Sequence, residues 1–348
     1  MSAAELHAAL VAGQFARARD LAREALALDR DDAYARATLG AALLHLGELP
    51  EAVLELAAAA ALDSADAGSR FNRALALDSL GRLEEAADSY REALSTDPTL
   101  LPAALNLGAA LSRTGDVAGS EAAYRQALAI DPSSSIARHM LAAFEGSGAT
   151  EVPADYVRAV FASAAPTFDS HLAELGYRTP ALLAELVGQR ARTLDLGCGT
   201  GLFGAAMAAP SEHLAGVDLS AQMLERASAR GIYDELHTAD IGDFLAADAR
   251  SWDLIAAADV LVYIGDLEPL LGLAAKRLAP GGVVGFSVEL STGEDPWALR
   301  RSGRFAHRRD YIDAVAARCR LEPVEFRETE LRRERGEPVA GALFVLSG

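Results

Sequence analysis

The hydrophobic and small residues of the first 150 positions recur with a period of 34 residues. One glycine marks each unit, at Gly13, Gly47, Gly81 and Gly115, and one aspartate follows it, at Asp29, Asp63, Asp97 and Asp131. Hydrophobic residues between these marks have helical spacing, which predicts a helix, a turn at the glycine, a second helix and a stop at the aspartate. The pattern therefore predicts an all-helical solenoid of about four repeats over residues 1–145, with 136–145 as its capping helix.

The pattern changes beyond residue 150, where short apolar runs alternate with helical stretches. Five runs predict strands, at Arg192–Leu196, His213–Val217, Asp234–Thr238, Leu254–Ala258 and Val283–Val288. Helical spacing predicts helices at 156–162 and 179–187, and the runs at 324–331 and 339–346 around Gly336 predict a hairpin. Alternation of strands and helices predicts an α/β domain over residues 152–348. The glycine- and serine-rich residues 146–151 are the predicted linker.

A glycine-rich turn follows the first of these strands, in Leu194-Asp-Leu-Gly-Cys-Gly-Thr-Gly201. Glycines permit a tight turn with little side-chain bulk, so that backbone atoms can approach a ligand. Asp218 ends the second strand, where doubly wound folds place a carboxylate that accepts hydrogen bonds from ribose hydroxyls. The expected ligand is therefore a nucleoside.

Two nucleoside ligands fit this pattern. Gly199-x-Gly201-x-x-Gly204 has the spacing of the dinucleotide fingerprint. Asp195 precedes the glycines and Asp240 ends a third strand, and a carboxylate beside the turn repels a pyrophosphate but attracts a sulfonium or an ammonium group. These acids favour S-adenosylmethionine, with a dinucleotide as the alternative.

Residues 152–348 resemble a class I S-adenosylmethionine-dependent methyltransferase. The resemblance lies in the glycine turn and in Val217–Ser220, Ala239–Ile241 and Leu278–Gly282. The resemblance implies a Rossmann-like, mostly parallel seven-stranded sheet with an antiparallel C-terminal hairpin, and S-adenosylhomocysteine as a product. It implies that Asp195 and Gly197 line the methionine end and that Asp218 holds the ribose. Met223 then covers the adenine, and Asp240 with Ile241 receives its amino edge. The expected cofactor-binding residues are Tyr156, Phe168, Asp195, Gly197, Cys198, Gly199, Gly201, Asp218, Leu219, Met223, Asp240, Ile241 and Asp259.

The 34-residue units resemble the tetratricopeptide repeat, as in Asn106-Leu-Gly108 and Ala122–Ala127. The whole chain is similar to a bacterial group of predicted methyltransferases fused to such repeats, through the segments that begin at Tyr156, Phe168 and Arg304. The repeats imply a protein or peptide partner in their groove. Candidate groove residues are Asn72, Arg73, Asn106, Arg113 and Arg138, and for each of them a solvated helix face is the alternative.

Candidate catalytic residues lie on the expected substrate side, beyond the carboxyl ends of the strands. His307 is the candidate general base, because its ordinary pKa is near neutrality and we expect it in a loop that faces the pocket. A histidine that fixes the loop, or that binds substrate, is the alternative. Tyr263 and Tyr311 are further catalytic candidates, with packing as the alternative for Tyr263. Glu289 and Arg304 are candidates for substrate contact, and no residues have the spacing of metal ligands.

Composition narrows the class of protein further. The 348 residues are 51% hydrophobic, and the net charge of −18 divides equally between residues 1–150 and the rest, which argues against a nucleic-acid partner. No run approaches the roughly 20 apolar residues of a membrane span, and the start has no export signal. Cys198 and Cys319 provide no disulfide framework. We therefore expect a soluble, cytoplasmic protein without a membrane partner.

Three functions remain open at this stage. The favoured one is methyl transfer to an acceptor that the solenoid recruits, such as a protein or peptide. A small-molecule O- or N-methyltransferase, in which the repeats serve assembly, is the second. The third is an interaction scaffold with a vestigial nucleoside site, against which the intact glycines and strand-end acids argue.

Overall fold

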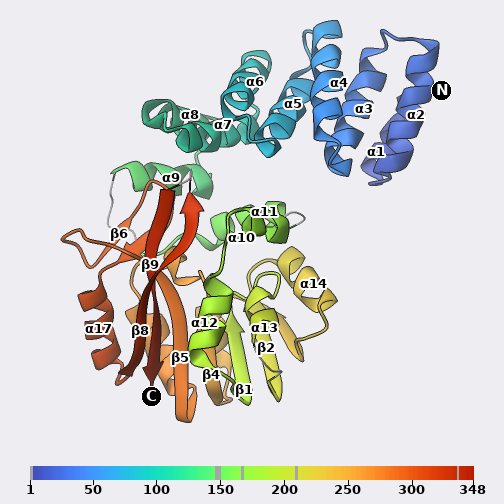
Figure 1. Cartoon of the computed structure of the whole chain (residues 1–348). Helices are drawn as coiled ribbons and strands as arrows, with labels where there is room; N and C mark the ends of the chain where they lie inside the picture. The colour runs from blue at the N-terminus through green and yellow to red at the C-terminus, as the bar shows by residue number, and fades with distance from the viewer. Residues whose placement is uncertain (1–2, 146–149, 166–167, 208–210, 335–336) are drawn as a thin grey trace. The chain divides into compact units, whose positions relative to one another are not determined.

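The computed structural model describes residues 3–145, 150–165, 168–207, 211–334 and 337–348, and it divides into two compact units, 1–141 and 142–348 (Figure 1). The boundary falls within helix α9, Ser135–Glu145. Within the described ranges, no helix is long and apolar enough to cross a membrane. Residues 146–149 of the predicted linker lie outside the described ranges, and the predicted domain limits stay a prediction.

The first unit is helical throughout its described elements, which confirms the solenoid prediction. Its helices are α1 Ala3–Val11, α2 Phe15–Leu28, α3 Ala33–Leu46, α4 Leu49–Leu62, α5 Ala67–Ser79, α6 Leu83–Thr96, α7 Leu101–Thr114 and α8 Val117–Ile130. Each helix packs against the next one in the chain (Figure 1). The recurring glycines have positive φ at helix ends, as at Gly47 (φ 77°), a conformation that glycine adopts without strain. The recurring aspartates follow helix C-termini, as at Asp63 after α4.

The second unit alternates strands and helices. Its strands are β1 Arg192–Leu196, β2 His213–Asp218, β3 Glu235–Thr238, β4 Trp252–Ala257, β5 Leu278–Leu290, β6 Trp297–Leu299, β7 Phe305–His307, β8 Glu322–Glu334 and β9 Glu337–Ser347. Its helices after α9 are α10 Ala154–Ala164, α11 Phe168–Glu174, α12 Thr179–Val187, α13 Leu202–Ala206, α14 Ala221–Ala229, α15 Ile241–Ala247, α16 Glu268–Lys276 and α17 Arg309–Arg318, with a 3-10 turn η1 at Leu261–Tyr263.

The strands form one mixed sheet. Strands β3, β2, β1, β4 and β5 are parallel neighbours in that order, β9 pairs antiparallel with β5, and β8 pairs antiparallel with β9. This is the predicted sheet with its C-terminal hairpin. The sheet also contains two strands that the sequence pattern did not predict: β7 pairs with the end of β5, and β6 pairs with β7. Each has three residues, too few for a hydrophobic period to be visible.

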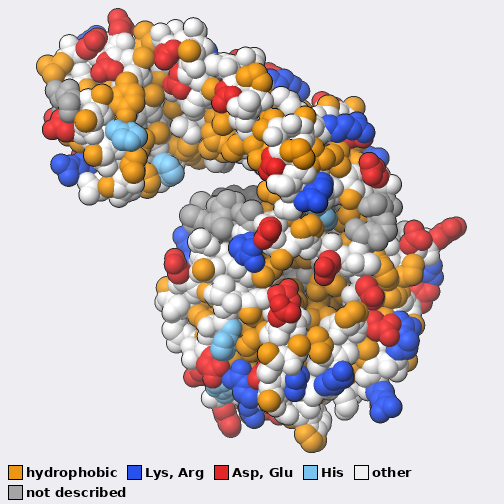
Figure 2. Space-filling view, turned by 180° about the vertical axis from the view of Figure 1, so that it is seen from behind, with side chains coloured by type: hydrophobic (Ala, Val, Ile, Leu, Met, Phe, Trp, Pro, Cys, Tyr) orange, Lys and Arg blue, Asp and Glu red, His pale blue; other side chains and the backbone are white. Residues whose placement is uncertain are grey.

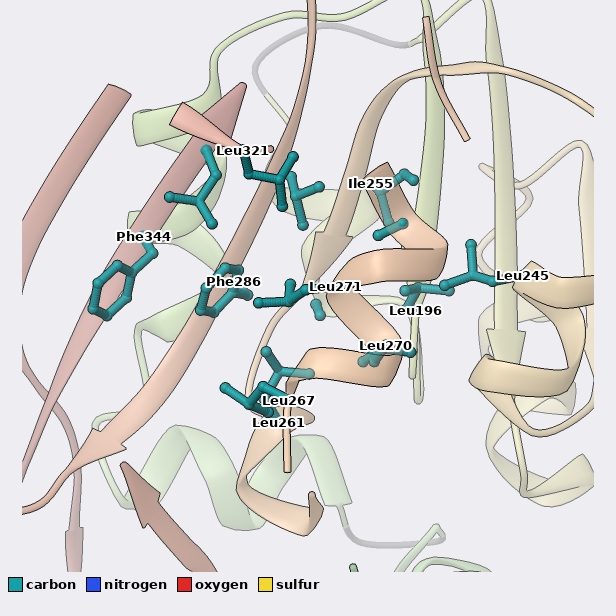
Figure 3. Close-up of a cluster of buried hydrophobic side chains, with 14 of the residues drawn as sticks. Leu196, Leu245, Ile255, Leu261, Leu267, Leu270, Leu271, Phe286, Leu321 and Phe344 are labelled. Carbon is teal, nitrogen blue, oxygen red and sulfur yellow. The ribbon is translucent and has the colours of Figure 1, made fainter. Parts of the chain in front are cut away.

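Apolar side chains cover both faces of this sheet, as parallel strands require. Leu196, Ile255, Phe286 and Phe344 lie on one face with leucines of α15 and α16, in the larger core cluster of Figure 3. The neighbouring positions of β4, Leu254 and Ala256, belong to a second cluster with α12 and α13 on the other face. The core therefore holds the strands so that their carboxyl ends lie at one edge of the sheet. The glycine turn follows β1 there, and Asp218 is the last residue of β2.

Segment 150–152 is hydrogen-bonded to residues 263–266 within the second unit. The carbonyl oxygen of Thr150 accepts hydrogen bonds from Gly265 N at 2.7 Å and Asp266 N at 3.1 Å, and Val152 N donates to Tyr263 O at 2.9 Å. Ala143 of α9 is buried with Val152 in a small apolar cluster. This part of the predicted linker is thus held against the domain by backbone hydrogen bonds and by packing.

Candidate functional site

The glycine turn connects β1 to α13 in a left-handed backbone conformation. Gly197, Gly199 and Gly201 have φ of 63°, 54° and 87°, values that side-chain-bearing residues rarely adopt. A Cβ atom at Gly197 would lie 2.5 Å from Val260 Cγ2, whereas a Cβ atom at Gly199 would meet no atom within 4 Å. The turn is therefore closed by protein at Gly197 and open at Gly199.

Asp218 lies directly beside the open glycine. Its Oδ2 accepts a hydrogen bond from Gly199 N at 2.9 Å, and its Oδ1 accepts one from Ser220 N at 2.8 Å. Burial raises the pKa of the carboxyl group. Each carboxylate oxygen has a further lone pair, so Asp218 can still accept hydrogen bonds from a ligand that lies against Gly199.

Asp195 is placed behind the turn. Its side chain is only 1% exposed, and its Oδ2 accepts a hydrogen bond of 2.6 Å from the hydroxyl of Tyr233. Burial raises the pKa of Asp195 to about 7, and the hydrogen bond from Tyr233 opposes that rise. The expected contact of Asp195 with the methionine end of S-adenosylmethionine stays a prediction. Because Asp195 is buried, its charge is better placed to attract the cofactor than its surface is to contact it.

A second set of contacts joins α11 to the turn. The carboxylate of Asp169 accepts hydrogen bonds from the Thr200 hydroxyl and from the Arg230 guanidinium, and Arg230 Nε donates to Thr200 O at 2.6 Å. The sequence pattern predicts neither Asp169 nor Arg230 as a site residue. Asp169 belongs to a segment that the resemblance had marked, but no local pattern pairs it with Arg230, 61 positions along the chain.

Other expected cofactor residues lie in the glycine turn and at the starts of α14 and α15. Met223 is fully buried in α14, whose first turn is capped by Ser220, and Leu219 is half-buried before it. Asp240 is exposed and caps α15 by accepting hydrogen bonds from Gly242 N and Asp243 N, so Ile241 is the first residue of that helix. Cys198 is buried, and burial raises the pKa of its thiol.

Two aromatic residues expected at the cofactor lie in the segment ahead of β1. Phe168 makes an edge contact with Phe161 at 5.9 Å between ring centroids, and Phe161 makes another with Tyr263 at 5.7 Å. Tyr156 packs in the same small cluster as Tyr263, and burial raises its pKa to about 12. Tyr156 and Tyr263 are thus brought together, while their contact with a ligand stays a prediction.

A buried ionic cluster lies at the carboxyl ends of β4 and β5 and is completed by Arg332 of β8. Asp259 has a strained φ of 60°, and its backbone N–H donates to Ser287 Oγ at 2.7 Å. Its carboxylate pairs with Arg332 at 3.2 Å, and the same guanidinium pairs with Glu289. Glu289 is 2% exposed and also pairs with Arg300 at 3.2 Å. Glu289 was expected to contact substrate, but here both its oxygens bind arginines.

His307 differs from its expected setting. It lies in β7 and not in a loop, it is fully buried, and its Nε2 faces the carbonyl oxygens of Ile264 at 2.8 Å and Gly265 at 3.1 Å. Two acceptors at Nε2 assign the proton to that nitrogen. Burial lowers the pKa of His307 to about 4. These contacts favour the alternative in which the histidine fixes a loop, and they do not favour the role of general base.

Tyr311 and Arg304 flank this histidine. The ring of Tyr311 stacks on His307 at 6.2 Å, its hydroxyl donates to Asp266 Oδ1 at 3.0 Å, and the same hydroxyl accepts a hydrogen bond from Leu267 N at 2.8 Å. Arg304 precedes β7, and its carbonyl oxygen accepts a hydrogen bond from Arg300 N. Tyr311 is therefore held by the loop 266–267, and its catalytic role stays a prediction.

Comparison with known proteins bears on this geometry. Residues 194–284 match the methyltransferase-domain family, and residues 4–69, 55–100 and 79–144 match the tetratricopeptide-repeat families. The ubiquinone biosynthesis O-methyltransferase of Aromatoleum aromaticum is 33% identical over 108 residues, which are 30% of this chain and 45% of that protein. The malonyl-[acyl-carrier protein] O-methyltransferase of Salmonella typhimurium is 31% identical over 132 residues, or 38% and 52% of the two chains. The chain thus spans about half the length of these curated relatives.

Among solved structures, the N-methyltransferase NodS of Bradyrhizobium japonicum in complex with S-adenosyl-L-homocysteine aligns with 49% of this chain and 85% of its own, at 24% identity and a TM-score of 0.41. The methyltransferase-domain match lies within the second unit and contains the glycine turn and Asp218, while the tetratricopeptide-repeat matches cover the first unit and end at residue 144. The chain therefore contains a class I S-adenosylmethionine-dependent methyltransferase domain C-terminal to tetratricopeptide repeats.

Proposed function

We propose that the second unit transfers the methyl group of S-adenosylmethionine to an acceptor molecule. The observation that carries the proposal is the hydrogen bond between Asp218 and Gly199 N, which holds a carboxylate next to the open side of the glycine turn. A ribose that lay against Gly199 would find acceptor oxygens for its two hydroxyls. A pyrophosphate there would meet the charges of Asp218 and Asp195, which disfavours a dinucleotide.

The bound cofactor would supply an activated methyl group on its sulfonium. The residues of this chain then have two tasks, to orient the cofactor and to hold the acceptor in line with the methyl group. Asp218 and the turn perform the first. For the second, Tyr263 and Tyr156 lie together near the carboxyl ends of the strands, on the side where such folds bind substrates.

Oxygen and nitrogen are both candidate acceptor atoms. The relatives named above include O-methyltransferases as well as an N-methyltransferase. A protein or peptide acceptor fits the repeat unit, since repeat solenoids present extended binding surfaces. Of the candidate groove residues, Arg113 pairs with Asp78 and Arg73 with Glu92, so these two arginines also join neighbouring helices. The face of the molecule in Figure 2 intersperses Lys and Arg with Asp and Glu, which does not favour a nucleic-acid acceptor.

Calorimetric titration of the full chain with S-adenosylmethionine tests the first half of the proposal. Asp218→Ala should weaken binding at least 10-fold, because charge-assisted hydrogen bonds of about 1.5–3 kcal/mol each are lost. Asp243→Ala, in the exposed first turn of α15, is the matched control and should bind as the native protein does. No binding by the native chain at millimolar ligand would leave the scaffold hypothesis in its place.

Labelling of a cell extract with radioactive S-adenosylmethionine tests the acceptor. The full chain should label a macromolecule. A chain that begins at Ser135, which lacks α1 to α8, should label it only at a raised KM. Equal labelling by both chains would refute recruitment by the repeats and leave assembly as their role.

A further inference from the structure

Tyr233 lies in the turn between α14 and β3, and its side chain passes behind the glycine turn. Its hydroxyl donates the 2.6 Å hydrogen bond to Asp195 Oδ2. Its side chain is half-buried, and no feature of the sequence analysis had marked it. Two functional elements, the β1 end and the turn before β3, are thus connected by one phenol.

Three glycines make room for this ring. A Cβ atom would lie 2.9 Å from Tyr233 Cε2 if placed at Gly201, 2.8 Å from its hydroxyl oxygen at Gly204, and 3.0 Å from its Cε1 at Gly216. Real Cβ atoms do not pack at such distances from a ring that cannot retreat. Gly199, by contrast, has nothing within 4 Å. Part of the glycine pattern therefore accommodates Tyr233, while Gly199 leaves space for a ligand.

The electrostatic surroundings of Asp195 show what the hydrogen bond from the Tyr233 hydroxyl does. Asp195 faces the carboxylate of Asp218 on β2, which disfavours a negative charge on it. Burial acts in the same direction, while the hydrogen bond from Tyr233 favours the ionised carboxylate. The thiol of Cys198 in the turn has a pKa raised by burial and stays neutral. Arg230, the cation that contacts the turn at Thr200, is engaged with Asp169 and with the Thr200 carbonyl.

We propose that Tyr233 is a positioning residue for the cofactor, which keeps Asp195 ionised behind the glycine turn so that its charge attracts the cationic end of S-adenosylmethionine. This inference rests on the proposed function. Tyr233 itself touches no ligand in it. Tyr233 contributes to cofactor binding through Asp195. In this it differs from a residue that only fills space beneath the glycine turn.

The pH dependence of binding follows from the sign of the charge. Burial raises the pKa of Asp195 to about 7, so the affinity of the native protein for S-adenosylmethionine should fall as the pH drops through that value. Tyr233→Phe removes the donor that favours the ionised form, which raises the pKa of Asp195 further. Because a hydrogen bond to a charged group is worth about 10- to 100-fold in an equilibrium, the midpoint should move upward by about one to two pH units. At pH 7 the ionised fraction of Asp195 falls from about one half to between about one tenth and one hundredth, so the variant should bind about 5- to 50-fold more weakly.

A double-mutant cycle distinguishes action through Asp195 from other effects of the phenol. Asp195→Asn removes the titrating charge and should flatten the pH profile near 7. In that background, adding Tyr233→Phe should change the affinity by less than about twofold. Tyr34→Phe, at an exposed tyrosine of α3, is the control for the substitution itself and should leave binding unchanged.

The outcomes separate the two proposals. If the native chain fails to bind S-adenosylmethionine at every pH, the proposed function fails. If it binds, but Tyr233→Phe leaves the affinity and its pH midpoint unchanged, or weakens binding equally in the Asp195→Asn background, the role of Tyr233 is overturned. Should Tyr233→Phe alone prevent folding, the double variant has no buried carboxylate at this position, and it must then bind as Asp195→Asn does or the inference is wrong.

Discussion

The buried cluster at Arg332 gives the sharpest stability prediction. Arg332 lies on β8, is 3% exposed, and shares its guanidinium between Asp259 and Glu289. Arg332→Met keeps an unbranched side chain of similar length but leaves two carboxylates without that cation. Removal of one partner from a buried ion pair costs about 3–5 kcal/mol, because the remaining charge stays desolvated. Arg300 still contacts Glu289, so we expect a loss near the lower end, about 3 kcal/mol.

Tryptophan fluorescence reports this loss selectively, because Trp252 and Trp297 both belong to the second unit and are the two tryptophans of the chain. With a urea dependence of about 3 kcal/mol per molar for a unit of this size, the midpoint of the fluorescence transition should fall by about 1 M. Arg333→Met is the matched control: its side chain is 57% exposed and pairs with the exposed Glu330. Surface pairs contribute about 0–1 kcal/mol, so its midpoint should move by less than about 0.3 M. Equal midpoints for the two variants would refute the assignment of a buried, stabilising guanidinium.

Three further predictions follow from the second unit. Burial lowers the pKa of His307 from 6.5 to about 4, so neutral His307 stabilises the fold fully above pH 6.5 and progressively less as the pH falls. In urea unfolding, the native protein should therefore lose about 2 kcal/mol more stability than His307→Gln between pH 7 and pH 5. Parallel losses of stability would contradict a buried neutral histidine. Gly199→Ala and Gly281→Ala both place a methyl group in open space at positive φ, so each should cost about 1–2 kcal/mol of stability, but only Gly199→Ala should weaken S-adenosylmethionine binding in calorimetry; equal affinities would put the ligand elsewhere. A chain beginning at Ser135 retains Ala143 in the apolar cluster. It should melt, by circular dichroism, at a higher temperature than a chain beginning at Thr150, which keeps the hydrogen bonds of Thr150 but lacks α9. Equal melting would mean that α9 adds nothing to the second unit.

Much of the fold could be predicted because its signals are local or periodic. The 34-residue repeat, the five parallel strands and the hairpin each leave a hydrophobic pattern within one stretch of sequence, and the structure confirms them. Strands β6 and β7 left no such pattern, because each is three residues long and is stabilised by pairing at the end of β5. The expectation of a loop at His307 failed for that reason.

The candidate site divides in the same way. The sequence by itself determined the glycine turn and Asp218, because backbone conformation at positive φ restricts the residue type directly and the strand end precedes the turn. Only the tertiary structure decided which partners the charged groups have: Tyr233 reaches Asp195 across 38 positions, and Arg332 reaches Glu289 across 43 and Asp259 across 73. Whether a carboxylate faces a ligand or a buried arginine depends on which distant segment packs beside it. Burial then sets its charge, and neither packing nor burial is encoded in the spacing of neighbouring residues.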